Sequence, residues 1–156
     1  MELSKADLFW QEYLESSGSD GEEKCSGDIN FESKGFQNDG QIVAILSGKK
    51  RAVFATLSSY IIDGEPLPIT GELYMVFDRA QNPCCIIEIE SVEIVPFSQV
   101  TEQMVIEEGD DENLEVWKDS HREIFEEEGD IVGFEFSPDL KLVFQQFKVV
   151  YTNRKL

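Results

Sequence analysis

Apolar residues near the N-terminus recur at helical spacing, with Leu8, Phe9 and Tyr13 on one side of the segment. Ser4 precedes them and can accept a hydrogen bond from the otherwise unpaired backbone amide of Asp7. The pattern therefore predicts a helix that begins just after Ser4.

The next part of the chain alternates between a polar stretch and a short apolar one. Residues 16–30 are rich in glycine, serine and acidic side chains and show no periodicity, which predicts a flexible acidic loop. A second helix is predicted to follow Asn38, because Gln41 lies three positions later, as in a capping box, and apolar residues continue to Leu46. Gly48 is expected to end this helix.

Two runs of β-forming residues, 52–62 and 72–77, predict strands separated by a proline-rich turn. Further along the chain, the apolar positions change parity near Ser91 and again across Gln145 and Gln146. Each change moves the buried side chains to the other face of the strand, so each indicates a β-bulge. Repeated bulges favour a small, strongly curved barrel.

A last helix is predicted between the later strands, where apolar residues recur at spacings of three and four and Asp110 or Asp111 can act as the cap. Its apolar residues are Leu114, Trp117, His121, Ile124 and Phe125. His121 is the only histidine, and its place on the apolar side predicts a packing role rather than a catalytic one. The helices and strands together predict an α+β fold.

The chain of 156 residues is long enough for one hydrophobic core, which predicts a single domain over 1–156. Its 13 basic and 32 acidic residues give a net charge of −19, which disfavours non-specific binding of long nucleic acids. The charge is uneven, because 101–130 holds thirteen acids and two bases, whereas 141–156 holds four bases and no acid. The basic segment leaves room for a local anion site, and the acidic one leaves open a basic protein partner.

Neither a long apolar run nor the basic start of a signal peptide is present, which predicts a cytoplasmic protein with no membrane partner. The three cysteines, two of them adjacent, are typical of reduced thiols in the cytosol. One histidine and an irregular acidic segment offer no recognisable zinc or calcium site. No metal and no cofactor is therefore expected.

Several short motifs follow one another in a fixed order along most of the chain. They are Gly48-Lys49-Lys50 after a helix, Leu67-Pro68 with Gly71, Glu108-Gly109-Asp110, and Trp117 with His121. In this order they resemble the bacterial ASCH domain family of the PUA-like superfamily. The resemblance implies a strongly bent, mixed or antiparallel β-barrel with flanking helices. It also implies a cleft beside the glycine-lysine turn that holds RNA or a nucleoside.

The predicted ligand-binding residues are Lys49, Lys50, Arg51, Thr56, Ser58, Tyr60 and Glu108. Cations at a helix end can hold a phosphate, and Thr56, Ser58 and Tyr60 are the candidates for a hydroxyl near Lys50. In amidohydrolase-like relatives a lysine, a threonine and a glutamate perform the chemistry, and these map onto Lys50, Val53 and Glu108. Val53 has no hydroxyl, so the expected nucleophile is missing. The leading hypothesis is a binding module for RNA or a modified nucleoside or nucleotide, and not an enzyme. The alternative is a hydrolase of N4-acylcytidine or RNA, in which Lys50 and Glu108 would be catalytic.

Overall fold

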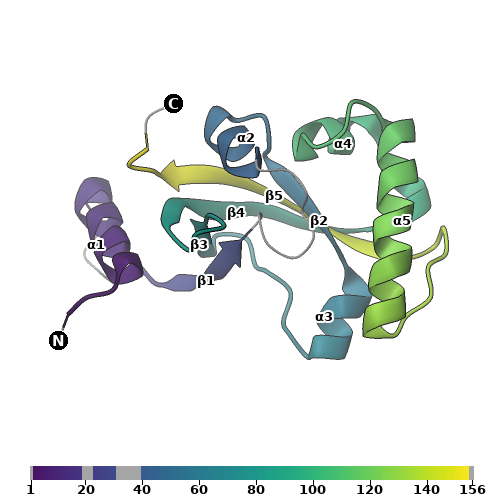
Figure 1. Cartoon of the computed structure of the whole chain (residues 1–156), viewed down its shortest axis with the longest axis horizontal. Coiled ribbons are helices and arrows are strands. Elements are labelled where there is room, and N and C mark those ends of the chain that lie inside the picture. The colour runs from purple at the N-terminus through teal and green to yellow at the C-terminus, as the bar shows by residue number, and fades with distance from the viewer. Residues whose placement is uncertain (1, 19–22, 31–39, 155–156) are drawn as a thin grey trace.

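The computed structural model describes residues 2–18, 23–30 and 40–154, which form one five-stranded mixed sheet with flanking helices (Figure 1). The order in the sheet is β1 (Cys25–Asn30), β3 (Leu73–Phe77), β4 (Pro83–Pro96), β5 (Lys141–Tyr151) and β2 (Ala52–Thr56). The β1–β3 pair is parallel and the other pairs are antiparallel. The α+β class predicted from the sequence is confirmed.

The sheet is open over the described residues, because β1 and β2 are its two edges and do not pair with each other. The expected mixed strands with flanking helices are therefore confirmed, and only the barrel is corrected to an open sheet. The two edge strands lie toward different ends of the long central pair. On one side, β3 pairs with the first half of β4, and β1 lies beyond it. On the other side, β2 pairs with the first half of β5, which runs along the second half of β4.

In the view of Figure 1, α1 lies at one end of the sheet, α4 and α5 lie at the other, and α2 and α3 lie above and below the strands between them. The helices are α1 (Lys5–Ser17), α2 (Gln41–Ser47), α3 (Leu57–Asp63), α4 (Glu102–Glu108) and α5 (Leu114–Val132), with a short 3₁₀ turn at Phe97–Gln99. In the part of the chain that the structure describes, none of them is long and apolar enough to cross a membrane.

The first helix begins as its sequence predicts. Ser4 Oγ accepts from the amide of Asp7 at 3.1 Å, and Asp7 Oδ2 accepts from the amide of Ser4 at 3.2 Å. This reciprocal capping box satisfies two backbone donors at the start of α1.

The expected acidic loop at 16–30 is wrong for its second half, where Cys25–Asn30 forms β1; residues 19–22 lie outside the described part of the chain. Pairing with β3 supplies the backbone hydrogen bonds of β1, so the strand needs few apolar side chains of its own. The predicted cap Asn38 also lies outside the described residues, and Gly40 is the N-cap of α2. Gly48 ends α2 in the left-handed conformation, as expected.

The strand predicted over 52–62 is wrong after Thr56, where α3 begins. Thr56 caps this helix, because its side chain accepts from the amide of Ser59. The local cap outweighs the β propensity of the residues that follow. The predicted cap of α5 is also wrong: it is Asn113 rather than Asp110 or Asp111, and its side chain accepts from the amide of Val116 at 2.9 Å.

The bulge predicted near Ser91 is confirmed in β4. Ile89 pairs with Phe147 and Ser91 pairs with the preceding residue of β5, so Glu90 is an extra residue in the ladder. This bulge exposes Glu90 beside β5.

The slip predicted at Gln145 and Gln146 is wrong, because both pair with consecutive residues of β2 without a shift. The irregularity in β5 lies between Val149 and Tyr151 instead. The parity argument failed because Leu142, Val143, Phe144 and Gln145 are all buried. A strand that is covered on both faces shows no alternation to interpret.

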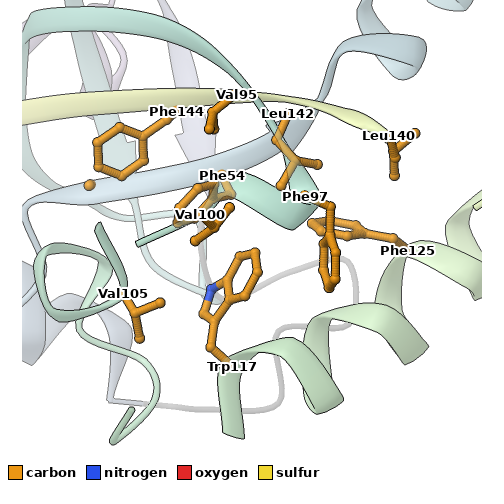
Figure 2. Packing of buried hydrophobic residues seen from close by; sticks show 11 residues of the cluster. Phe54, Val95, Phe97, Val100, Val105, Trp117, Phe125, Leu140, Leu142 and Phe144 are labelled. Carbon is orange, nitrogen blue, oxygen red and sulfur yellow. The ribbon is translucent and has the colours of Figure 1, made fainter. Parts of the chain in front are cut away.

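An aromatic core packs α5 against β2, the second half of β4 and the first half of β5 (Figure 2). Trp117 is fully buried, stacked on Phe97 at 5.4 Å between ring centroids and tilted against Phe54 at 4.9 Å. Phe125 packs edge-on against the same Phe97 ring. These contacts fix the N-terminal half of α5. They thereby also fix His121, which lies one turn after Trp117 on the buried side of the helix.

Candidate functional site

Two turns meet at the centre of the candidate site: the Lys49-Lys50 turn after α2 and the turn between α4 and α5. The amide of Arg51 donates to the carbonyl of Glu107 at 2.7 Å and ties the two turns together. Gly109 has a φ of +78°, and a Cβ there would lie 2.5 Å from the carbonyl oxygen of Lys49. Glycine is therefore required at this position for two reasons, its left-handed backbone and the close approach of another main chain.

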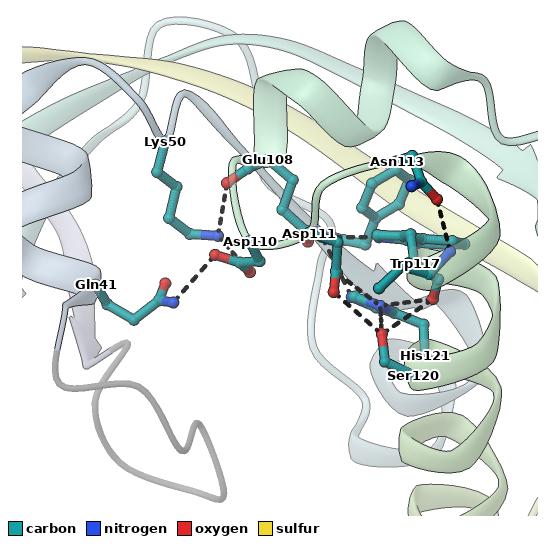
Figure 3. Close-up of polar contacts among 11 residues, drawn as sticks. Gln41, Lys50, Glu108, Asp110, Asp111, Asn113, Trp117, Ser120 and His121 are labelled. Carbon is teal, nitrogen blue, oxygen red and sulfur yellow. Dashed lines mark hydrogen bonds and ion pairs between the residues drawn. The ribbon is translucent and has the colours of Figure 1, made fainter.

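Lys50 extends from its turn into the protein interior, where the residue is 1% exposed (Figure 3). Its Nζ donates to the carbonyl of Glu108 at 3.2 Å and to Asp110 Oδ2 at 3.0 Å. A buried ammonium group is stable only when it is paired and hydrogen-bonded. The structure thus brings Lys50 and Glu108 together, and it adds Asp110 as the carboxylate that pairs directly with the lysine.

The Glu108 carboxylate is 2% exposed and accepts hydrogen bonds on both oxygens. Trp117 Nε1 donates to Oε1 at 2.8 Å, and the amide of Phe54 donates to Oε2 at 3.2 Å. Burial raises the pKa of Glu108, but the hydrogen bond from His121, the charge of Lys50 and the other donors outweigh it, so that its pKa lies below the ordinary value. Glu108 is therefore held in its ionised form.

His121 lies between two carboxylates and is stacked on Trp117 at 4.3 Å. Its Nε2 is 3.2 Å from Glu108 Oε1, and its Nδ1 is 3.6 Å from Asp111 Oδ2. Burial raises the pKa of Asp111, and the nearby charge of Glu108 adds to this, against the opposing effect of His121. His121 is thus buried as predicted, and it also links two acids that the sequence did not connect to it.

Gln41, at the start of α2, is also buried and contacts Asp110 on the side away from His121 (Figure 3). Its Nε2 donates to Asp110 Oδ1 at 3.0 Å, whereas its Oε1 is buried and has no hydrogen-bond partner among the described residues. The contact with Asp110 fixes the orientation of the amide, because a flipped amide would face one oxygen with another. An unsatisfied buried carbonyl oxygen costs about 1–3 kcal/mol of stability. A hydrogen bond from a further donor to Gln41 Oε1 would recover that cost.

A groove with a volume of about 280 Å³ lies beside the same turn, between the end of α2 and β5. Arg51 and Lys148 line it, and both are exposed, with Lys148 Nζ in a loose ion pair with Glu88 Oε2 at 3.7 Å. Glu90, the bulge residue of β4, lines it as well, together with apolar side chains of α2 and β5. The groove therefore offers two cations and one carboxylate around an apolar floor.

The ASCH domain family matches residues 28–151 of this chain. The chain belongs to the ASCH domain family. It is 34% identical to the ASCH domain from Lactobacillus crispatus, with a TM-score of 0.85 and 94% of each chain covered. A protein from Enterococcus faecalis is 29% identical, with a TM-score of 0.81 and coverage of 94% of this chain and 88% of that one.

A more distant structure shares the ASCH fold alone: the Zymomonas mobilis ASCH protein is 14% identical, with a TM-score of 0.51 and coverage of 80% of this chain and 70% of that one. A search of curated proteins found no match.

The site residues predicted from the sequence fall into two groups. Lys49, Lys50 and Arg51 form the turn after α2, next to Glu108. Thr56, Ser58 and Tyr60 lie at the end of β2 and in α3, which is well separated from α2 in Figure 1.

The second group has partners of its own in the ASCH fold. The hydroxyl of Thr56 donates to Glu128 at 2.7 Å, and the hydroxyl of Tyr60 accepts from Gln145 at 3.1 Å. Burial raises the pKa of Tyr60. These contacts join α3 to α5 and β5. They explain the burial of Thr56 without any need for a role in ligand binding.

Three residues of this ASCH domain offer possible metal ligands that the sequence did not predict. Ligand atoms of Glu108, Asp111 and His121 lie within 4.8 Å of one another. The donors suit a divalent transition metal, but the two ring nitrogens of His121 face different carboxylates. Glu108 Oε1 also accepts from Trp117. An ion would have to displace these hydrogen bonds, so the cluster fits a hydrogen-bonded network better than a metal site.

Proposed function

We propose that this ASCH domain is a binding module for a nucleotide or a short RNA feature, held in the groove beside the Gly48-Lys49-Lys50 turn. The observation that carries the proposal is the pair of exposed cations, Arg51 and Lys148, in one groove of a chain whose net charge is −19. Such a pair attracts a phosphate group locally, although the protein as a whole repels long polyanions.

The other groups of the groove complement a base. Glu90 supplies a carboxylate that accepts from an exocyclic amine, and the apolar side chains from α2 and β5 supply a surface for a ring. The volume of about 280 Å³ fits one nucleotide unit rather than a long strand. Lys50 supports the site from the interior: its ion pair with Asp110 and its hydrogen bond to the carbonyl of Glu108 fix the turn that presents Arg51.

Calorimetric titration with cytidine, adenosine and uridine monophosphates, their nucleosides and a short oligonucleotide tests the proposal. Arg51→Ala and Lys148→Ala are each expected to weaken nucleotide binding by about 10- to 100-fold, the loss of one charge-assisted hydrogen bond. Lys141→Ala is the matched control, because Lys141 is an exposed lysine at the other end of β5. Equal affinity in all three variants and the parent would refute the groove as the site.

Lys50→Ala is less informative as a binding test, because it removes one partner of a buried charge pair. The loss is expected to cost about 3–5 kcal/mol of stability. A binding defect in this variant would not distinguish a lost contact from a disordered turn.

The proximity of Lys50 and Glu108 favours a second candidate, a hydrolase of an N4-acylated cytidine or of RNA. Val53 is the obstacle, because it lies in β2 opposite Gln145 and has no hydroxyl. Incubation of the parent and of Val53→Thr with N4-acetylcytidine and with unstructured RNA separates the two functions. Turnover by the parent would overturn the binding proposal, and turnover by Val53→Thr alone would show a hydrolase site without its nucleophile.

A cytoplasmic location also remains a proposal. None of the three cysteines forms a disulfide, which supports a reducing compartment.

A further inference from the structure

A second groove lies at the other end of the molecule, between the first turns of α1 and the edge of the sheet at β1 and β3. Its volume is about 360 Å³, and it shares no residue with the groove beside Lys50. Asp7, Trp10, Asp28 and Met75 are among the residues that line it. Figure 1 places α1 and β1 at the opposite end from α4 and α5.

The parallel pairing of β1 with β3 places the carboxylate of Asp28 on the face of the sheet that α1 covers. Asp28 pairs with Met75, which is 3% exposed and packs in the cluster of Phe9 and Tyr13 from α1. The next residue, Ile29, packs in the separate cluster of α2. Alternation along the strand thus places the exposed side chain of Asp28 on the α1 side of the sheet edge.

The groove combines an aromatic ring with two acids. Trp10 is partly buried and held against Tyr13 at 5.2 Å between ring centroids. Asp7 lines the same groove and uses one oxygen to accept from the amide of Ser4. Within the described part of the chain, neither Asp7 nor Asp28 forms an ion pair. An indole beside unpaired carboxylates is the combination that attracts an ammonium or guanidinium group.

The N-terminal part of the sequence is also acidic. Residues 1–30 contain eight acids and two bases. One of the two bases, Lys5, is directed to Asn82 through a hydrogen bond of 2.9 Å. Acidic surroundings raise the local concentration of a basic partner and speed its association.

We propose that this groove binds a lysine or arginine side chain from an extended basic segment of a partner protein. Trp10 contacts the cation through its ring, and Asp28 pairs with it. β1 is an edge strand among the described strands, so an extended segment can run alongside it while its basic side chain enters the groove. The proposal is independent of the nucleotide site, which lies at the other end of the protein.

The position of Asp28 on an edge strand has a competing structural explanation. A charged side chain on an edge strand discourages other strands from pairing with it, and Asp28 can serve that purpose alone. The two explanations predict opposite results with a basic peptide, because edge protection requires no affinity for it.

Fluorescence anisotropy with a short labelled peptide of alternating lysine and serine tests the proposal. Two control peptides, in which glutamine or glutamate replaces every lysine, test whether binding depends on the positive charge. Only the lysine peptide is expected to bind. Asp28→Asn and Trp10→Leu are each expected to weaken it about fivefold or more, the scale of one cation–π or ion-pair contact. Asp63→Asn is the matched control, because it removes the same charge from the exposed end of α3.

Three outcomes would overturn the proposal. The first is no binding of the lysine peptide up to about 1 mM, an affinity too weak to hold a partner. The second is an equal effect of Asp28→Asn and Asp63→Asn, which would show general attraction to an acidic protein. The third is a dimer in analytical ultracentrifugation that Asp28→Asn dissociates, which would assign the groove to a second copy of the chain. Unchanged thermal unfolding of each variant confirms that binding, and not folding, is measured.

Discussion

Replacement of Gly109 by alanine tests whether the close contact between the two turns organises the site. The residue has a φ of +78°, and its Cβ would lie 2.5 Å from Lys49 O and 3.2 Å from Lys50 Cα. The left-handed conformation alone costs a side chain about 1–2 kcal/mol. The contact is with main-chain atoms that cannot rotate away, so the turns must separate. We expect a total loss of about 3–4 kcal/mol in the free energy of unfolding, in the range of severe substitutions.

Gly64→Ala is the control for Gly109→Ala. Gly64 ends α3 with a φ of +68°, and a Cβ there would have nothing within 4 Å. It should show the backbone cost alone, a decrease in Tm of about 2–4 °C for each kcal/mol. Urea unfolding and thermal unfolding of both variants measure the difference. If Gly109→Ala loses no more stability than Gly64→Ala, the turns are not packed as tightly as described, and the placement of Lys50 beside Glu108 loses its support.

The remaining predictions concern Glu108 and the cysteines. Because the pKa of Glu108 is lowered on folding, its charge stabilises the protein above the unfolded pKa of about 4.3, and this contribution is lost as the pH falls through the folded pKa. Glu108→Gln should therefore destabilise the protein most near neutral pH, and urea unfolding should show the gap to the parent closing in acid. A gap that widens in acid would contradict the sign of the shift. Burial raises the pKa of Cys85 to about 12, and both Cys84 and Cys85 are fully buried, so iodoacetamide should modify only Cys25 in the native protein. Mass spectrometry that finds Cys85 alkylated without unfolding would disprove its burial.

Several features of the fold were predictable because neighbours in the sequence cause them. Ser4 caps α1 through Asp7, and Gly48 ends α2, both within a single turn of chain. The bulge near Ser91 was visible because one face of that strand is buried and the other is not. Where Leu142 to Gln145 are buried on both faces, the same argument failed.

The candidate site was predictable in part. Family resemblance named Lys50 and Glu108, and the structure brings them together. It did not indicate Gln41, whose importance comes from a contact with Asp110 across 69 positions. Nor did it indicate Lys148 and Glu90, which reach the groove through the pairing of β5 with β4 and the bulge at Glu90.

The sequence by itself determined the N-cap of α1, the glycine that ends α2, the family and the acidic character of the chain, since each depends on residue type or on contacts a few positions apart. Only the tertiary structure decided that Cys25–Asn30 is a strand, that Lys50 is buried rather than exposed, and that a second groove lies beside α1. Strand pairing and burial depend on segments far apart in the chain. The local sequence does not specify which segments those are, and only the folded chain brings them together.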